Sequence, residues 1–188
     1  MPPRRPRGHG SNVLPKSNPE STEPFDAAVR LLARRPYSVS EFRRLLRRKL
    51  KDETVVKEAI AKLRQLGLLD DRKFALQYAS FLVRHRAFGP DRVRRELQLK
   101  QVDEPAIDAA IASAYEETPE EQVLDRVLEK KLRSVPLPLT VPKFYLLCQS
   151  LRRLGFRSDV IMKTMRARLN EHSQSGMMNS EFRIMNDE

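Results

Sequence analysis

Arginine is the residue type whose spacing in this chain of 188 residues points most directly to chemistry. One short run holds four of them: Arg43, Arg44, Arg47 and Arg48. On a helix, a spacing of four residues aligns them in two pairs, and like charges so placed repel each other. An anionic partner would offset this repulsion. The run therefore predicts a surface that binds a polyanion, and the alternative is an ordinary solvated helix face.

Two later groups of arginines repeat this arrangement. The second group is Arg92, Arg94 and Arg95, and the third is Arg152 and Arg153. Together with the first run, they make nine candidate residues for binding a polyanion or an acidic protein surface. If the three groups lie on equivalent helices, one molecule would touch such a partner at several regular points.

The distribution of charge along the chain agrees with an anionic partner. The chain has 36 Lys and Arg against 25 Asp and Glu, which gives a formal net charge of +11. Residues 25–75 carry +7 and residues 119–172 carry +5, whereas residues 76–118 between them carry −1. Two basic blocks on either side of a neutral one indicate a nucleic acid or a nucleoprotein.

The sequence offers no constellation of residues suited to catalysis. A Gly-rich phosphate loop that ends in Lys and Ser or Thr is absent, which argues against nucleotide hydrolysis. The histidines have no spacing that suits a metal: they are His9, His85 and His172. We therefore expect a protein that is not an enzyme and that has no metal site and no cofactor.

Three acidic or thiol side chains have simpler explanations than a site. Asp70 and Asp71 could be offered as a magnesium site, but beside a helix start they are better explained as cap and helix-dipole partners. Cys148 lies close to an apolar stripe, where we expect a half-buried core residue rather than a nucleophile. A single cysteine forms no internal disulfide, and no apolar run approaches the roughly 20 residues that cross a bilayer. These features favour a cytoplasmic protein without membrane attachment.

The elements that must position the arginines belong to a duplicated unit. Shifting the chain by 51 residues against itself gives eleven identities across 33 positions, among them Arg43 with Arg94 and Arg44 with Arg95. A weaker third copy follows at a shift of 54, provided that an insertion is allowed near residues 135–142. The three arginine groups then fall on the corresponding helix of each copy.

Each copy has the pattern of three helices, because apolar residues recur at spacings of three and four between turn signals. In the first copy, Ser38 and Glu41 have the form of a capping box that opens the second helix, and Gly67 predicts the end of the third. In the second copy, Gly89 and Pro90 predict the start of the second helix. The arginine groups are thus expected on the second helix of each copy.

Two further expectations concern the later copies. In the second copy, the first helix should bury a stripe formed by Phe74, Tyr78, Phe81 and Leu82. The third copy should open with Thr118 as the helix cap and Pro119 as the first helical residue.

The fold class that follows is all-α, with three tandem three-helix units of the helix-turn-helix kind in an elongated, curved array. Units of roughly 45–50 residues are near the lower limit for independent stability, so neighbouring units should pack on each other. The expected repeats are residues 23–69, 70–117 and 118–172. Residues 1–22 and 173–188 are short of periodic apolar residues, and we expect both to be disordered tails.

Three-helix units with a basic helix also resemble helix-turn-helix readers of DNA, which leaves a second class of function open. A sequence reader usually places Asn, Gln or Ser beside Arg to contact base edges, whereas these helices offer mostly Arg and Lys. Contact with a nucleic-acid backbone or with a protein therefore fits better.

The second copy resembles the signature of the bacterial RecX regulatory proteins, and the first copy adds support. The matching residues are Gly67 to Ala75, Tyr78, Arg86 to Leu97, Lys100, Leu32 to Arg35 and Ser40 to Phe42. The resemblance covers about residues 25–170. It departs where that family often has a Gly after the Lys of the second copy, since Gln101 stands here.

What this resemblance implies is a cytoplasmic regulator of the RecA recombinase that has no catalysis of its own. Proteins of this family bind along the groove of the RecA filament on single-stranded DNA and restrain strand exchange, ATP hydrolysis and co-protease activity in DNA repair and the SOS response. The expected partners are the RecA filament and single-stranded DNA, with duplex DNA as a further one, and the expected state is a monomer. The alternative function is a helix-turn-helix-like DNA-binding protein that acts independently of RecA.

Overall fold

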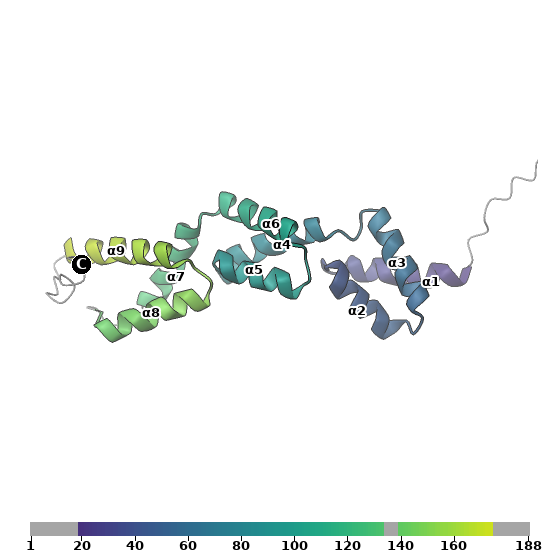
Figure 1. Cartoon of the computed structure of the whole chain (residues 1–188), viewed down its shortest axis with the longest axis horizontal. Coiled ribbons are helices and arrows are strands. Elements are labelled where there is room, and N and C mark those ends of the chain that lie inside the picture. Colours follow the sequence, from purple (N-terminus) through teal and green to yellow (C-terminus); the bar gives the residue numbers. More distant parts are fainter. Residues whose placement is uncertain (1–18, 134–138, 175–188) are drawn as a thin grey trace, which may run out of the picture.

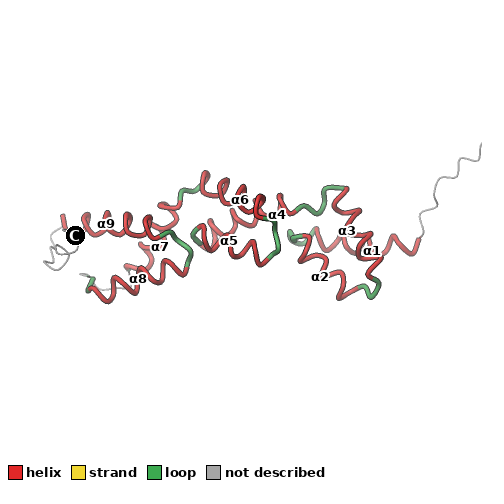
Figure 2. The backbone as a smooth tube through the Cα atoms, in the orientation of Figure 1, coloured by secondary structure: helices red, strands yellow, loops and turns green. Residues whose placement is uncertain are grey.

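The computed structural model describes residues 19–133 and 139–174, and every regular element within these ranges is helical (Figures 1 and 2). Three groups of three helices follow one another along an elongated molecule. Repeat 1 consists of α1 Pro19–Leu32, α2 Val39–Lys49 and α3 Glu53–Gln65. Repeat 2 consists of α4 Asp71–Phe81, α5 Pro90–Leu99 and α6 Glu104–Glu117. Repeat 3 consists of α7 Glu120–Leu132, α8 Val141–Arg153 and α9 Ser158–Gln174. The expected all-α array of three-helix units is confirmed.

Local sequence signals fix several of the helix ends. The Ser38 hydroxyl accepts a hydrogen bond from the backbone N–H of Glu41 at 3.1 Å, as a cap of α2 should. Asp70 caps α4, because its carboxylate accepts from the backbone N–H of Arg72 at 2.8 Å. Gly67 follows α3 with a φ of +66°, the left-handed conformation that glycine adopts without strain.

The outermost helices extend past the boundaries expected from the sequence. α1 begins at Pro19, so residues 19–22, which we assigned to the N-terminal tail, are helical. A proline without a backbone N–H is well tolerated in the first turn, where that donor has no helical partner. α9 continues to Gln174. The rest of both expected tails, residues 1–18 and 175–188, lies outside the described residues.

The start of α7 differs from the prediction. Thr118 closes α6, donating its backbone N–H to Ala114 O at 3.1 Å, and Pro119 rather than Thr118 precedes the first helical residue. That residue, Glu120, is buried and accepts hydrogen bonds from the backbone N–H and the Nε of Arg157 at 2.9 and 2.8 Å. A buried carboxylate needs such partners, and Arg157 lies too far along the chain for the local sequence to show the pairing.

The apolar interior is divided unequally among the repeats. Repeat 1 has its own core, built around side chains such as Phe42, Leu46 and Leu63. Repeats 2 and 3 share one continuous core, in which Leu97 of α5 and Leu124 of α7 are both fully buried. Repeats 2 and 3 therefore form one packing unit, to which repeat 1 is attached.

The end of α4 is irregular. The helix widens into a π-helical turn over Leu82–Arg86, which closes on Ala87 at a φ of +50°. Leu82 and Val83, inside the turn, are buried, whereas Phe81, the last residue of α4 before the turn, is 44% exposed. The expectation that Phe81 belongs to the buried stripe is therefore wrong. Turns of this kind are frequent at functional sites.

Candidate polyanion-binding site

The second helices of the three repeats form a single row along one side of the molecule (Figure 1). The end of α8 meets the start of α5, and the end of α5 meets the start of α2, so the three helices run in the same direction. We call α2, α5 and α8 the second-helix row. The duplicated sequence thus positions its three arginine groups on one continuous element.

The joint between α8 and α5 is made by backbone atoms. The N–H of Gly89 donates to Leu154 O at 2.8 Å, and the N–H of Asp91 donates to Gly155 O at 3.1 Å. The unpaired amides at one helix start thereby satisfy the unpaired carbonyls at another helix end. The two chains approach so closely that a Cβ on Gly89 would lie 2.3 Å from the carbonyl carbon of Gly155.

The joint between α5 and α2 occupies the equivalent position in the repeat but is made by polar side chains. The Ser38 hydroxyl, at the position that matches Gly89, donates to Lys100 O at 2.8 Å. The Lys100 ammonium pairs with Glu41 at 2.9 Å, and the Ser40 hydroxyl donates to Gln101. Repeat 1 is thus held to repeat 2 by polar contacts outside its core.

Gln101 explains where this chain departs from the resembling family. It matches Gly155 in the repeat, and both residues have a left-handed backbone conformation, with a φ of +58° at Gln101 and +89° at Gly155. Glycine adopts this conformation without strain, which accounts for a Gly that often stands there in the family. Here the side chain of Gln101 contacts Ser40 instead.

Two carboxylates at this joint have shifted pKa values. Burial acts to raise the pKa of Glu41, but hydrogen bonds from Lys100 and Arg35 outweigh it and the pKa lies below its usual value. Burial raises the pKa of Asp71, which accepts a hydrogen bond from the backbone N–H of Val39 at 2.9 Å. Asp71 was expected to serve α4 alone, but it also connects repeat 2 to repeat 1.

Replacing Lys100 with methionine should weaken this joint. The substitution leaves the half-buried Glu41 without its ammonium partner, at a cost of about 1 kcal/mol given that both side chains keep some contact with water. Because the pKa of Glu41 is lowered in the folded state, its contribution is present at neutral pH and is lost as the pH falls through that lowered pKa. Amide exchange in α2 should therefore quicken at neutral pH, and the difference from the parent chain should narrow in acid. Faster amide exchange in α9, or unchanged amide exchange in α2, would contradict this prediction. The control is K73M, which removes the charge of an exposed lysine.

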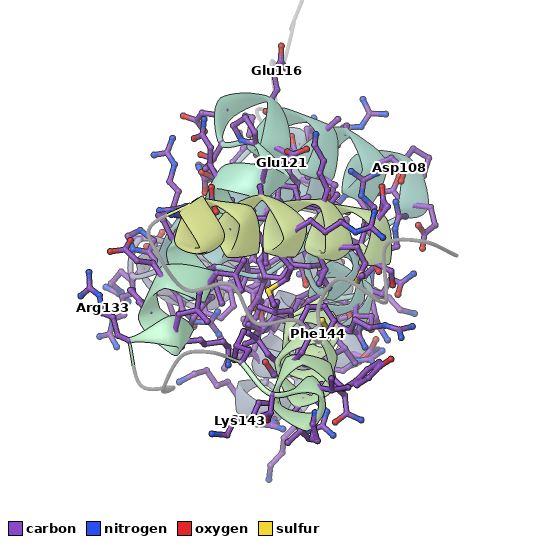
Figure 3. The ribbon with its side chains drawn as sticks, turned by 90° about the vertical axis from the view of Figure 1, so that its left-hand side faces the viewer. Asp108, Glu116, Glu121, Arg133, Lys143 and Phe144 are labelled. Atoms are coloured by element: carbon purple, nitrogen blue, oxygen red, sulfur yellow. The ribbon has the colours of Figure 1, made fainter. Side chains whose placement is uncertain are left out.

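The second-helix row is strongly basic. Its three helices contain eleven Arg and Lys and three Asp and Glu, a net charge of +8. By contrast, α6 contains four acidic residues and no basic one. Figure 3 shows this segregation from one end of the molecule, with Asp108 and Glu116 at the upper side and Lys143 of α8 at the lower side. A polyanion is therefore attracted to the row and not to α6.

Three of the nine predicted arginines are engaged in ion pairs with nearby carboxylates. Arg47 binds Glu53 through two hydrogen bonds of 2.8 and 2.6 Å. Arg92 pairs with Glu96 at 2.9 Å, and Arg94 pairs with two acidic residues of α6, Glu104 and Asp108. These pairs neutralise much of the positive charge of α5. The two ion pairs of Arg94 also hold α5 to α6.

The other six arginines are exposed, and none makes an ion pair within residues 25–133 and 139–168: Arg43, Arg44, Arg48, Arg95, Arg152 and Arg153. Arg43, Arg44 and Arg48 lie on α2, Arg152 and Arg153 lie at the end of α8, and Arg95 lies on α5 between these two groups. Sequence reasoning missed Lys143, an exposed cation on α8, because only arginines were considered.

The remaining candidates for chemistry have structural roles. Cys148 is half-buried, and burial raises the pKa of its thiol, which disfavours the nucleophilic thiolate. Within the described ranges no three His, Cys, Asp or Glu side chains gather as metal ligands would. None of the described helices has the length and apolar character to span a membrane.

Family models match two segments of the chain. Residues 25–63 match the model described as RecX, first three-helix domain, and residues 70–111 match RecX, second three-helix domain. The two segments correspond to repeat 1 and to most of repeat 2.

Whole-length comparisons give the same result. The chain is 31% identical over 149 residues to the regulatory protein RecX of Chlorobaculum tepidum, covering 79% of this chain and 90% of that one. It is 36% identical over 155 residues to the regulatory protein RecX of Stenotrophomonas maltophilia, covering 80% and 90%. In fold, it is similar to the crystal structure of RecX from Lactobacillus salivarius, with a TM-score of 0.65 and 22% identity over 79% of this chain and 96% of that one.

Proposed function

This chain belongs to the RecX family of regulatory proteins, and from that membership we propose that it binds the RecA filament on single-stranded DNA and inhibits RecA. The activities of RecA that we propose to be inhibited are its recombinase, ATPase and co-protease activities in DNA repair and the SOS response. The observation that carries it is the second-helix row, a continuous basic element with a net charge of +8.

The spacing of the unpaired arginines suits a periodic partner. Arg152 and Arg153 end α8, and Arg48 lies near the far end of α2. The 10 residues of α5 and 11 residues of α2 between these ends span about 30 Å at roughly 1.5 Å per residue. Two cationic groups on one semi-rigid element can hold two points of a filament at once, which raises the effective affinity of each.

The proposal extends to the setting in which the chain works. We infer a monomer in the cytoplasm that has no catalytic activity of its own and acts by occupying the filament. Its own side chains supply binding and charge, while the hydrolysis of ATP belongs to RecA.

The direct test adds the protein to preformed RecA filaments on single-stranded DNA and measures DNA-dependent ATP hydrolysis. We expect turnover to fall at amounts of protein well below that of RecA, because one molecule restrains more than one filament subunit. Unchanged turnover at equimolar protein would contradict the proposal. Tight, sequence-dependent binding to bare duplex at physiological salt would instead support the alternative of a DNA-binding protein that acts without RecA.

A further inference from the structure

Four aromatic rings form a column along one face of α4 and the π-helical turn that follows it. The ring centroids of Phe74 and Tyr78 are 5.3 Å apart, those of Tyr78 and Phe81 are 6.4 Å apart, and those of Phe81 and His85 are 5.1 Å apart. The first two pairs are stacked within 19° of parallel. The column begins in the core at Phe74 and ends in solvent at His85.

The outer end of the column lies outside the shared core. Phe81 is 44% exposed, and His85 is exposed as well. Leu82 and Val83, which stand between these two residues in the chain, are buried in the shared core.

Cations surround these rings. Arg84 and Arg86, which flank His85, are both exposed. Arg84 pairs with Glu117, whereas Arg86 makes no ion pair within the described side chains. At the inner part of the column, Lys100 of the joint between α5 and α2 lies 5.7 Å from the Tyr78 ring. Exposed aromatic rings beside cations are the two components of a surface for single-stranded nucleic acid.

We propose that an unpaired base of single-stranded nucleic acid stacks on the exposed end of this column, on His85 and the open edge of Phe81, while Arg86 contacts the adjacent phosphate. The inference deepens the proposed function, on which it rests, by naming a site for the single strand. It adds a contact that the arginines of the second-helix row do not provide.

The chemistry of the site favours an unpaired base over a duplex or a protein segment. Bases in a duplex are already stacked on each other and present only their edges, whereas an unpaired base has a free face for a ring. A flanking arginine suits the phosphate of a nucleotide. α4 also packs against α5, one of the three helices of the second-helix row.

The test uses the full chain with the double substitution F81L and H85A. We expect its affinity for oligothymidine to fall roughly 10-fold, since a stacked base contributes about that much, with the salt dependence unchanged because no phosphate contact is lost. Binding to a matched duplex should stay as it was. The control is L76A, which removes another exposed apolar side chain from α4.

A second measurement needs no substitution. The parent chain should bind oligothymidine more tightly than an abasic strand of the same length, and the double variant should lose that preference. Equal binding of both strands by the parent chain would overturn the site, as would equal losses on duplex and single strand. A variant that binds the strand normally but no longer inhibits the filament would assign the column to a protein contact and overturn the inference. If the parent chain leaves RecA turnover unchanged, the proposed function fails, whatever the strands show.

Discussion

Replacing Gly155 with alanine should destabilise the chain by roughly 3 kcal/mol or more, because the new methyl group meets a closed joint in a strained conformation. A Cβ at Gly155 would lie 2.2 Å from the backbone nitrogen of Arg92. It would also hold a left-handed φ of +89°, which costs an L-residue about 1–2 kcal/mol. Since backbone atoms cannot move aside as a side chain can, α8 and α5 would have to separate.

Substitutions at two other glycines separate the two causes of this loss of stability, the close approach of the backbones and the left-handed φ. Gly89 has an ordinary φ of −82°, but its Cβ would lie 2.3 Å from Gly155, so G89A tests the close approach alone. Gly67 has a φ of +66° and open space, the nearest atom being the Lys73 ammonium at 3.9 Å, so G67A tests the backbone strain alone. Denaturant unfolding followed by circular dichroism should rank the losses with G67A the smallest and G155A the largest.

The regions that unfold provide a further check. Because repeats 2 and 3 share one core, G155A should increase amide exchange in α5 and α8 together and leave α3 of repeat 1 nearly unaffected. A G155A chain that unfolds at the parent's denaturant midpoint would show that the two backbones do not meet in this way.

Features set by neighbouring residues were predicted well from the sequence. The cap of α2 at Ser38, the stop at Gly67 and the start of α5 after Gly89 all depend on the backbone chemistry of a few consecutive residues. The 51-residue repeat also anticipated that Arg43 and Arg94 would occupy equivalent helices. These signals are local, or repeat a local signal, so one sequence suffices to show them.

Features set by distant partners could not be predicted in this way. Arg94 was grouped with the free arginines, but its partners Glu104 and Asp108 stand on the next helix and become neighbours only after α5 and α6 pack. The same reason hid the burial of Glu120 against Arg157. Phe81 shares the helical spacing of Phe74 and Tyr78 but is exposed, because the packing of α4 against distant helices decides which part of its apolar face is covered. The end-to-end alignment of the second helices was likewise not foreseen.

Removing the three unpaired arginines of α2 should weaken binding to single-stranded DNA by about 50-fold at 0.15 M salt. Each phosphate contact releases about 0.7 counterion from a single strand, so three lost contacts reduce the salt slope by about 2 and give this loss of affinity. The variant is R43Q with R44Q and R48Q. Arg47 is left in place because its removal would leave Glu53 without a partner. The measured loss of affinity would then mix the loss of positive charge with a loss of helix stability. Inhibition of RecA turnover should require correspondingly more protein.

A matched control removes the same charge from other faces of the same part of the molecule. Its substitutions are K57Q, R64Q and R72Q, at exposed residues of α3 and α4 that make no ion pair within the described side chains. If the partner responded only to net charge, the two variants would lose affinity equally, and the second-helix row would have no special role. If the row is the binding surface, the control should keep most of the affinity and nearly the parent's salt slope, because long-range attraction between exposed charges is screened within about 8 Å at this salt concentration. The difference between these two slopes therefore measures how many phosphates these three arginines contact.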